Sequence, residues 1–148
     1  MTSETTPAEQ LWFAMRKAAT MMERHADAVV ARATGVSLGQ YMVLSVVHAR
    51  TGPVTQQAIA DRLGLTKGTV SRLLDGARRA GHAETAPSET SRRERVVTLT
   101  PAGRAVVDAA DVAMLGSEMA TFAMREPALA ATMVEGLHAL IASLEEAD

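Results

Sequence analysis

The feature that most constrains this sequence is a pair of short amphipathic helices predicted on either side of one glycine turn. Thr55 can cap the first helix, which runs through Leu63, and Gly64 then opens a tight turn. Thr66 can cap a longer second helix from Lys67 to Ala80. Two helices joined by a turn of three or four residues that contains glycine are typical of a helix-turn-helix.

The second helix has an apolar face and an opposite face of small and charged residues. At 100° per residue, Val70 and Leu74 point inward while Gly68 and Arg72 point outward. Glycine allows close backbone approach, hydroxyls can donate to phosphates or base edges, and arginine can reach guanine in a major groove. We therefore take the polar residues of both helices as candidate DNA contacts: Thr55, Gln56, Thr66, Lys67, Gly68, Thr69, Ser71, Arg72 and Arg79.

A β-hairpin is predicted directly after these helices. Two short segments rich in strand formers, 83–88 and 95–99, flank a polar stretch from Glu89 to Glu94. A flexible basic loop can enter a minor groove, where the negative potential attracts guanidinium groups. The arginines at or near the hairpin tip are therefore further candidate DNA contacts: Arg92, Arg93 and Arg95.

The formal net charge of −2 over 148 residues, taken alone, argues against a polyanionic partner. The distribution of charge reverses that inference. From Arg62 to Arg104 the chain holds nine basic and four acidic residues, a sum of +5, which leaves −7 for the remainder. The positive charge therefore lies on the segment with the groove-binding pattern, as expected for a nucleic-acid-binding protein.

Long helices are predicted on both sides of this segment. Residues 7–33 carry apolar side chains at steps of four and three, and Ser37 can cap a short apolar helix that follows. Pro101 and Pro127 each mark a helix start in the C-terminal part, where one apolar face runs as far as Ser117. These stripes could cover the middle of the same chain, but their length favours packing against a second copy.

Several classes of site have no support in the sequence. The absence of cysteine excludes disulfides and thiolate metal sites. The four histidines are far apart, and neither a hydrolase motif nor a phosphate-binding glycine loop occurs, so we expect no metal, no cofactor and no enzymatic activity. No signal peptide precedes Pro7, and no apolar run of about 18 residues predicts a membrane span. These patterns favour the cytoplasm.

The segment from Val36 to Gly103 resembles the winged helix-turn-helix of the MarR family of bacterial transcriptional regulators. The runs AIADRLGL (58–65) and TVSRLLD (69–75) match that family's recognition region. Arg93, Val97, Leu99 and Thr100 match its wing signature. The resemblance implies a homodimer on palindromic operator DNA, which often represses transcription and is released by a small aromatic or phenolic ligand.

The chain departs from the family pattern at three places. Ser91 stands where the family has a wing aspartate that braces the wing arginine, so the resemblance implies either a looser wing or substitution by Glu89 or Glu94. Gly76 and Ala77 replace larger residues, and a glycine inside a helix costs about 1 kcal/mol relative to alanine. His82 replaces an apolar residue at the entry to the wing.

A ligand pocket in this family lies between the dimer helices and the DNA-binding lobe. The residues that could line one here combine apolar walls, a stacking surface and a cationic head: Trp12, Arg16, Tyr41, Met42 and His48. Plain core or dimer contacts explain Trp12 and Tyr41 equally well.

The sequence therefore predicts a mainly α protein with a small β-hairpin wing. We expect one domain over 1–148, with a winged helix-turn-helix lobe at 36–100 and helical dimerisation regions at 7–34 and 101–148. The predicted function is a sequence-specific, DNA-binding transcriptional regulator, a repressor by resemblance, that acts as a homodimer. The alternative is a winged-helix module that binds a small molecule or a partner protein and no longer uses DNA.

Overall fold

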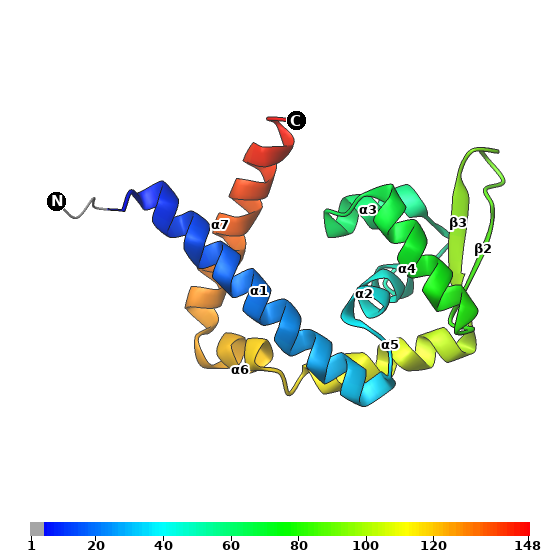
Figure 1. Ribbon diagram of the computed structural model, residues 1–148, viewed down its shortest axis with the longest axis horizontal. Coiled ribbons are helices and arrows are strands. Elements are labelled where there is room, and N and C mark those ends of the chain that lie inside the picture. Colours follow the sequence, from blue (N-terminus) through cyan, green and yellow to red (C-terminus); the bar gives the residue numbers. More distant parts are fainter. Residues whose placement is uncertain (1–4) are drawn as a thin grey trace. The chain divides into compact units, whose positions relative to one another are not determined.

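The computed structural model describes residues 5–148, which form two compact units divided between Met114 and Leu115. The first contains five helices and three strands, and the second contains two helices (Figure 1). In chain order the elements are α1 (Pro7–Thr34), α2 (Leu38–His48), β1 (Val54–Thr55), α3 (Gln56–Leu63), α4 (Lys67–Arg79), β2 (Ala83–Pro87), β3 (Arg95–Leu99), α5 (Pro101–Met114), α6 (Glu118–Arg125) and α7 (Pro127–Glu145).

Helix α1 begins and ends at well-formed caps. The Thr6 hydroxyl accepts a hydrogen bond from the Glu9 amide, and the Glu9 carboxylate accepts one from the Thr6 amide, which completes a capping box. The hydrogen bonds that the Glu9 carboxylate accepts from the Thr6 amide and the Thr6 hydroxyl lower the pKa of the Glu9 carboxyl. Gly35 ends the helix at a φ of 76°, a left-handed conformation that glycine adopts without strain. The predicted helix over 7–33 is confirmed.

The helix-turn-helix forms where the sequence predicts it. Thr55 accepts a hydrogen bond from the Ala58 amide at the start of α3, and Gly64 ends that helix at a φ of 64°. Thr66 accepts one from the Thr69 amide at the start of α4. Side-chain caps and a left-handed glycine are local signals, so both boundaries follow from the sequence alone.

The sheet has three antiparallel strands in the order β1–β3–β2. The predicted hairpin is confirmed as β2 and β3, with Ala83 opposite Leu99 and Pro87 opposite Arg95. The two-residue strand β1 was not predicted, because Val54 and Thr55 become a strand only by pairing with Val97 and Val96 of β3.

One apolar core holds the first unit together. It includes Val43 and Leu44 of α2, Ile59 of α3, Leu74 of α4 and Val97 of β3, all almost fully buried. A smaller cluster joins α1 to α5 through contacts around Val30, Val36 and Ala110. The core therefore fixes α4 and the sheet relative to α2 and α5.

The second unit consists of α6 and α7, which contact each other. The predicted apolar face that runs along one helix to Ser117 is wrong at its end: α5 stops at Met114, and Ser117 instead caps α6 by accepting a hydrogen bond from the Ala120 amide. No residue of α7 is buried, and Ile141 and Leu144 are 50% and 60% exposed.

Helix α7 is also apolar and long enough, by length and composition alone, to cross a membrane, and α1 with α2 would qualify only as a span broken by a 77° bend. No uninterrupted apolar run marks α7 in the sequence, because Glu135 and His138 interrupt it. A helix that packs in an interface meets the same test, so composition alone assigns no membrane to this helix.

Candidate nucleic-acid interface

Helix α4 presents the predicted polar face to the outside. Val70, Leu74 and Ala77 are buried against the core, whereas Gly68 and Arg72 are exposed. Thr69 and Ser71 are half-buried. Open space surrounds the position that a Cβ would take at Gly68, so the backbone is accessible to a bulky partner there. The N-terminal half of α4 therefore presents small side chains around Gly68, where a partner can approach the backbone closely.

A chain of three side chains leads from the N-cap of α4 to Arg72. The hydroxyls of Thr66 and Thr69 lie 2.9 Å apart, and an Arg72 guanidinium nitrogen lies 3.5 Å from the Thr69 hydroxyl. At that length the arginine contact is loose, so most guanidinium donors stay available to another acceptor. Lys67, also exposed, lies in the same first turn, where unpaired helix amides favour an anion.

The C-terminal half of α4 differs from its N-terminal half. Arg78 pairs with Asp75 across one turn at 3.7 Å, with both side chains about half exposed. No ion pair of Arg79 is found among residues 5–148, and its side chain is exposed. Earlier in the helix, Gly76 faces Gln40 of α2 so closely that a Cβ there would meet the Gln40 amide nitrogen. Gly76, where the family has a larger residue, therefore allows Gln40 of α2 to lie close to the α4 backbone.

Two predicted contacts on α3 have structural roles of their own. Thr55 uses its hydroxyl oxygen as the N-cap of α3, and Gln56 in the first turn is half-buried. The next residue, Gln57, is exposed and donates a 2.8 Å hydrogen bond to Asp61. Helix α3 thus presents fewer unoccupied polar groups than α4.

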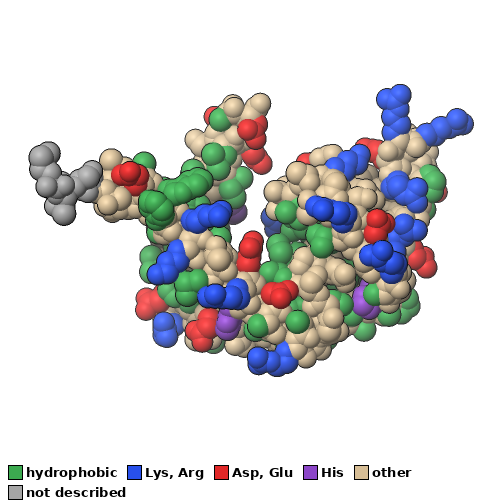
Figure 2. Space-filling model, in the orientation of Figure 1, with side chains coloured by type: hydrophobic (Ala, Val, Ile, Leu, Met, Phe, Trp, Pro, Cys, Tyr) green, Lys and Arg blue, Asp and Glu red, His purple; other side chains and the backbone are tan. Residues whose placement is uncertain are grey.

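The wing carries exposed arginines at its tip. Arg92 and Arg93 lie in the loop between β2 and β3, and Arg95 begins β3, where its guanidinium donates to the Thr85 hydroxyl at 3.2 Å. Figure 2 shows Lys and Arg side chains gathered over the α4 and β2–β3 part of this face, some of them extending beyond the hairpin end. Helix α4 and the wing therefore concentrate the basic side chains of the first unit.

Ser91 replaces the wing aspartate with a different contact. Its hydroxyl accepts a hydrogen bond from the Arg93 amide at 3.3 Å, and its carbonyl oxygen accepts one from the Glu94 amide. Across the described chain, neither Glu89 nor Glu94 forms an ion pair with a wing arginine. Ser91 thus orders the backbone of the turn and leaves the guanidinium groups without a carboxylate.

The base of the wing is held more firmly than its tip. The Thr100 hydroxyl donates to the Gly81 carbonyl oxygen at 2.6 Å and accepts from the Gly103 amide at 3.0 Å. Next to this clasp, His82 is half-buried, and its Nδ1 is buried with no hydrogen-bond partner in the structure. The histidine that replaces an apolar residue therefore brings an unpaired ring nitrogen into the base of the wing.

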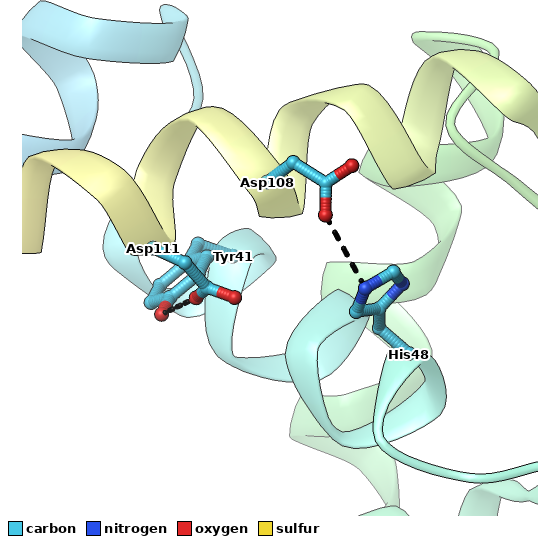
Figure 3. A network of polar contacts seen from close by, with 4 residues as sticks. All are labelled: Tyr41, His48, Asp108 and Asp111. Atoms are coloured by element: carbon cyan, nitrogen blue, oxygen red, sulfur yellow. Dashed lines mark hydrogen bonds and ion pairs between the residues drawn. The ribbon is translucent and has the colours of Figure 1, made fainter.

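Of the predicted ligand residues, two lie on the face of α2 that meets α5 (Figure 3). Tyr41 donates a 2.6 Å hydrogen bond to Asp111, and His48 Nε2 lies 3.4 Å from Asp108. The pKa of Tyr41 is raised to about 12, chiefly by burial and further by the hydrogen bond to Asp111 and its negative charge. The two aspartates were not predicted, because nothing local in the sequence pairs residues about 60 or 70 positions apart.

The other predicted ligand residues do not join this pair. Trp12 is 67% exposed on α1, and it lies about 27 Å along the helix from Val30, near which Tyr41 packs. Arg16 is exposed one turn from Trp12, and Met42 is 38% exposed. None of Trp12, Arg16, Tyr41 and Met42 lines the three best-formed hollows of the described chain. The five residues therefore form no single pocket within one copy of the chain.

The described residues also offer no metal centre. No group of three or more His, Cys, Asp or Glu side chains between residues 5 and 148 could hold a metal ion. The polar groups brought together around α4 and the wing are hydroxyls and guanidinium groups, which bind phosphates and base edges rather than metals.

Comparison with known proteins shows which family and which solved structures the chain is similar to. The model of the MarR family matches residues 34–94. No curated protein matches the chain. Among solved structures, Staphylococcus aureus MepR in its DNA-binding conformation superposes with a TM-score of 0.77 at 23% identity, covering 90% of this chain and 98% of that one.

Two further structures share the fold. Sco3205 of Streptomyces coelicolor, a MarR family regulator solved in complex with DNA, has a TM-score of 0.78 at 20% identity, over 92% of this chain and 87% of that chain. A MarR/EmrR family regulator from Acinetobacter sp. ADP1 has a TM-score of 0.81 at 19% identity, over 95% of this chain and 99% of that one. At these identities the likeness establishes the winged-helix fold. Over residues 34–94, which carry the helix-turn-helix and the first strand of the wing, the chain is similar to the MarR family.

Proposed function

We propose that this chain is a sequence-specific DNA-binding transcriptional regulator that acts in the cytoplasm, chiefly as a repressor. The observation that carries the proposal is the exposed face of α4, where Gly68 and Arg72 are open to a partner beside a wing with arginines at its tip. A helix with small residues and one arginine fits a major groove, and the wing arginines suit the adjacent minor groove.

The proposed assembly is a homodimer on palindromic duplex DNA. Helix α1 exposes Leu11, Trp12 and Phe13, each by more than half, and the whole of α7 is unburied. Large exposed apolar faces mark interaction surfaces. A second copy would bury them and present two α4 helices to half-sites about 34 Å apart, one turn of DNA.

We further propose that a small aromatic or phenolic ligand releases the dimer from DNA. The support is the family resemblance and the position of Tyr41 and His48, which face α5 at the root of the DNA-binding lobe. A ligand that displaced either side chain from its aspartate would change how α2 packs on α5.

Selection of duplexes from a random pool tests the DNA-binding proposal without knowledge of the operator. The selected sequences should contain an inverted repeat, and fluorescence anisotropy should show binding that weakens steeply with added salt. Arg125→Ala removes an exposed arginine of the second unit, outside the winged helix, and should leave the affinity for the selected duplex unchanged. Recovery of no enriched sequence, with affinity insensitive to salt, would instead support a winged-helix module that binds a small molecule or a protein.

A further inference from the structure

A hollow of about 330 Å³ lies on the first unit, apart from α4 and from the wing tip. Its walls come from the last turn of α2, the loop that follows, strand β3 and the first turn of α5. The accessible apolar part is formed by the exposed Pro53 and the half-buried Leu99, with the buried Val47 and Val97 beneath. Pockets that bind small ligands begin at about this volume and are mostly apolar.

The ionisable side chains that line the hollow are all basic. Three side chains from separate segments line it, namely His48, Arg50 and Arg104, and no acidic residue does. Asp108 lies outside this lining and pairs with His48 at 3.4 Å. The two guanidinium groups therefore face the hollow without a carboxylate partner in the described part of the chain.

Arg104 is held in position by the fold. One of its guanidinium nitrogens donates to the Leu99 carbonyl oxygen at 3.1 Å, which fixes the side chain against the end of β3. A guanidinium has five N–H donors, so several remain for a ligand. Arg50 is exposed on the loop and supplies a second cation from another direction. The C-terminal end of α2 carries partial negative charge, so an anion here would depend on these arginines.

We infer that this hollow is a binding site for a small organic carboxylate with an apolar body. The carboxylate would accept charge-assisted hydrogen bonds from Arg104 and Arg50, and the apolar body would cover Pro53 and Leu99. The hollow shares His48 with the pocket expected around Trp12 and Tyr41, but Trp12, Arg16, Tyr41 and Met42 do not line it, and its two arginines belong to neither α1 nor α2. Binding itself requires no DNA; only an effect of the ligand on DNA affinity rests on the proposed function.

Titration of the full-length protein with benzoate, followed by two-dimensional NMR of the backbone amides, tests the inference. We expect chemical-shift changes confined to the end of α2, residues 97–99 and the start of α5, saturating at millimolar concentration as befits so small a ligand. Benzamide, which keeps the ring but lacks the charge, and acetate, which keeps the charge but lacks the ring, should each bind at least several-fold more weakly.

Variants separate the site from nonspecific binding. Arg50→Gln leaves the Arg104 hydrogen bond to Leu99 in place and should weaken benzoate binding roughly tenfold, as expected for loss of one charge-assisted bond. Arg32→Gln, an exposed arginine in the last turn of α1, is the matched control and should change nothing. Absence of localised shifts, or equal affinity for benzamide or for Arg50→Gln, would overturn the inference. Duplex binding measured without benzoate reports separately on the proposed function.

Discussion

The hydroxyl of Tyr41 in α2 donates a 2.6 Å hydrogen bond to the Asp111 carboxylate in α5. This bond and the His48–Asp108 pair, one α5 turn away, join the DNA-binding lobe to the helix that leads away from it. Because Tyr41 is the only tyrosine in the chain, its ionisation can be observed without overlap from another phenol.

We expect the Tyr41 phenol to titrate near pH 12, well above an ordinary tyrosine. The folded-state pKa is raised, so the native protein holds this proton longer than the unfolded chain does. The contribution to stability is therefore present below pH 10 and is lost as the pH rises through 12. Ultraviolet absorbance of the phenolate, with circular dichroism to confirm folding at each pH, measures this value.

Asp111→Asn separates the two causes of that shift. The variant should lower the Tyr41 pKa toward 10 without reaching it, because burial is the larger cause and the aspartate the smaller. A pKa unchanged by the substitution would show that the bond to Asp111 does not affect ionisation.

Gly103→Ala should destabilise the protein by about 1–3 kcal/mol or more. A Cβ at this position would collide with the His82 carbonyl oxygen, a backbone atom that cannot rotate away. Urea denaturation measures the decrease in the free energy of unfolding. Gly136→Ala is the matched control, since a Cβ there meets open space on α7 and alanine favours the helix by up to about 1 kcal/mol. Equal stability of the Gly103 variant and the parent protein would contradict the predicted collision.

Arg72→Ala should weaken binding to the selected duplex by about 1–3 kcal/mol and relax the preference at one base pair of each half-site. The reason is that Arg72 is the only long side chain on the exposed N-terminal half of α4 besides Lys67. Anisotropy against the selected duplex and its single-base variants provides the measurement. If the preference at every base pair stays intact, Arg72 makes no base contact.

Replacement of Arg92 and Arg93 by alanine should act on salt dependence more than on sequence preference. For each phosphate that an arginine no longer neutralises, the slope of log K against log salt should become shallower by about 0.9. The Arg125→Ala control should keep the parent slope. A double variant that also keeps the slope would remove the wing tip from the DNA interface.

Ile141→Glu should convert the proposed dimer to monomers. Ile141 is half exposed on a helix without a buried residue, and a charge buried in an apolar interface is strongly unfavourable. Sedimentation equilibrium gives the association state, and Ile141→Leu serves as the conservative control. A dimer of unchanged stability would show that this side of α7 is not at the interface.

The elements that the sequence predicts best are those with local signals. Thr55, Gly64 and Thr66 fix the helix-turn-helix by caps and a left-handed turn within a few residues. Strand β1 and the pairing of Asp108 and Asp111 with α2 depend on residues far along the chain, so periodicity cannot reveal them. The misplaced Ser117 shows the same limit, since its small side chain fits a helix face and an N-cap equally well.

Residue type and place in the motif predict which side chains are candidate DNA contacts, and the structure shows which of these candidates have an acidic neighbour. It leaves Arg72 and the wing arginines free of carboxylates within residues 5–148 but gives Arg78 an acidic partner. It also spreads Trp12 and Tyr41 apart along the fold, so a pocket that includes both would need a second copy.

The clasp of Thr100 to Gly81 and Gly103 has a mechanical consequence. Because these hydrogen bonds join the base of the hairpin to the start of α5, we expect the wing and α5 to rotate as one body. A small rotation of α5 would therefore sweep the arginine tip through a much larger arc, in or out of the groove.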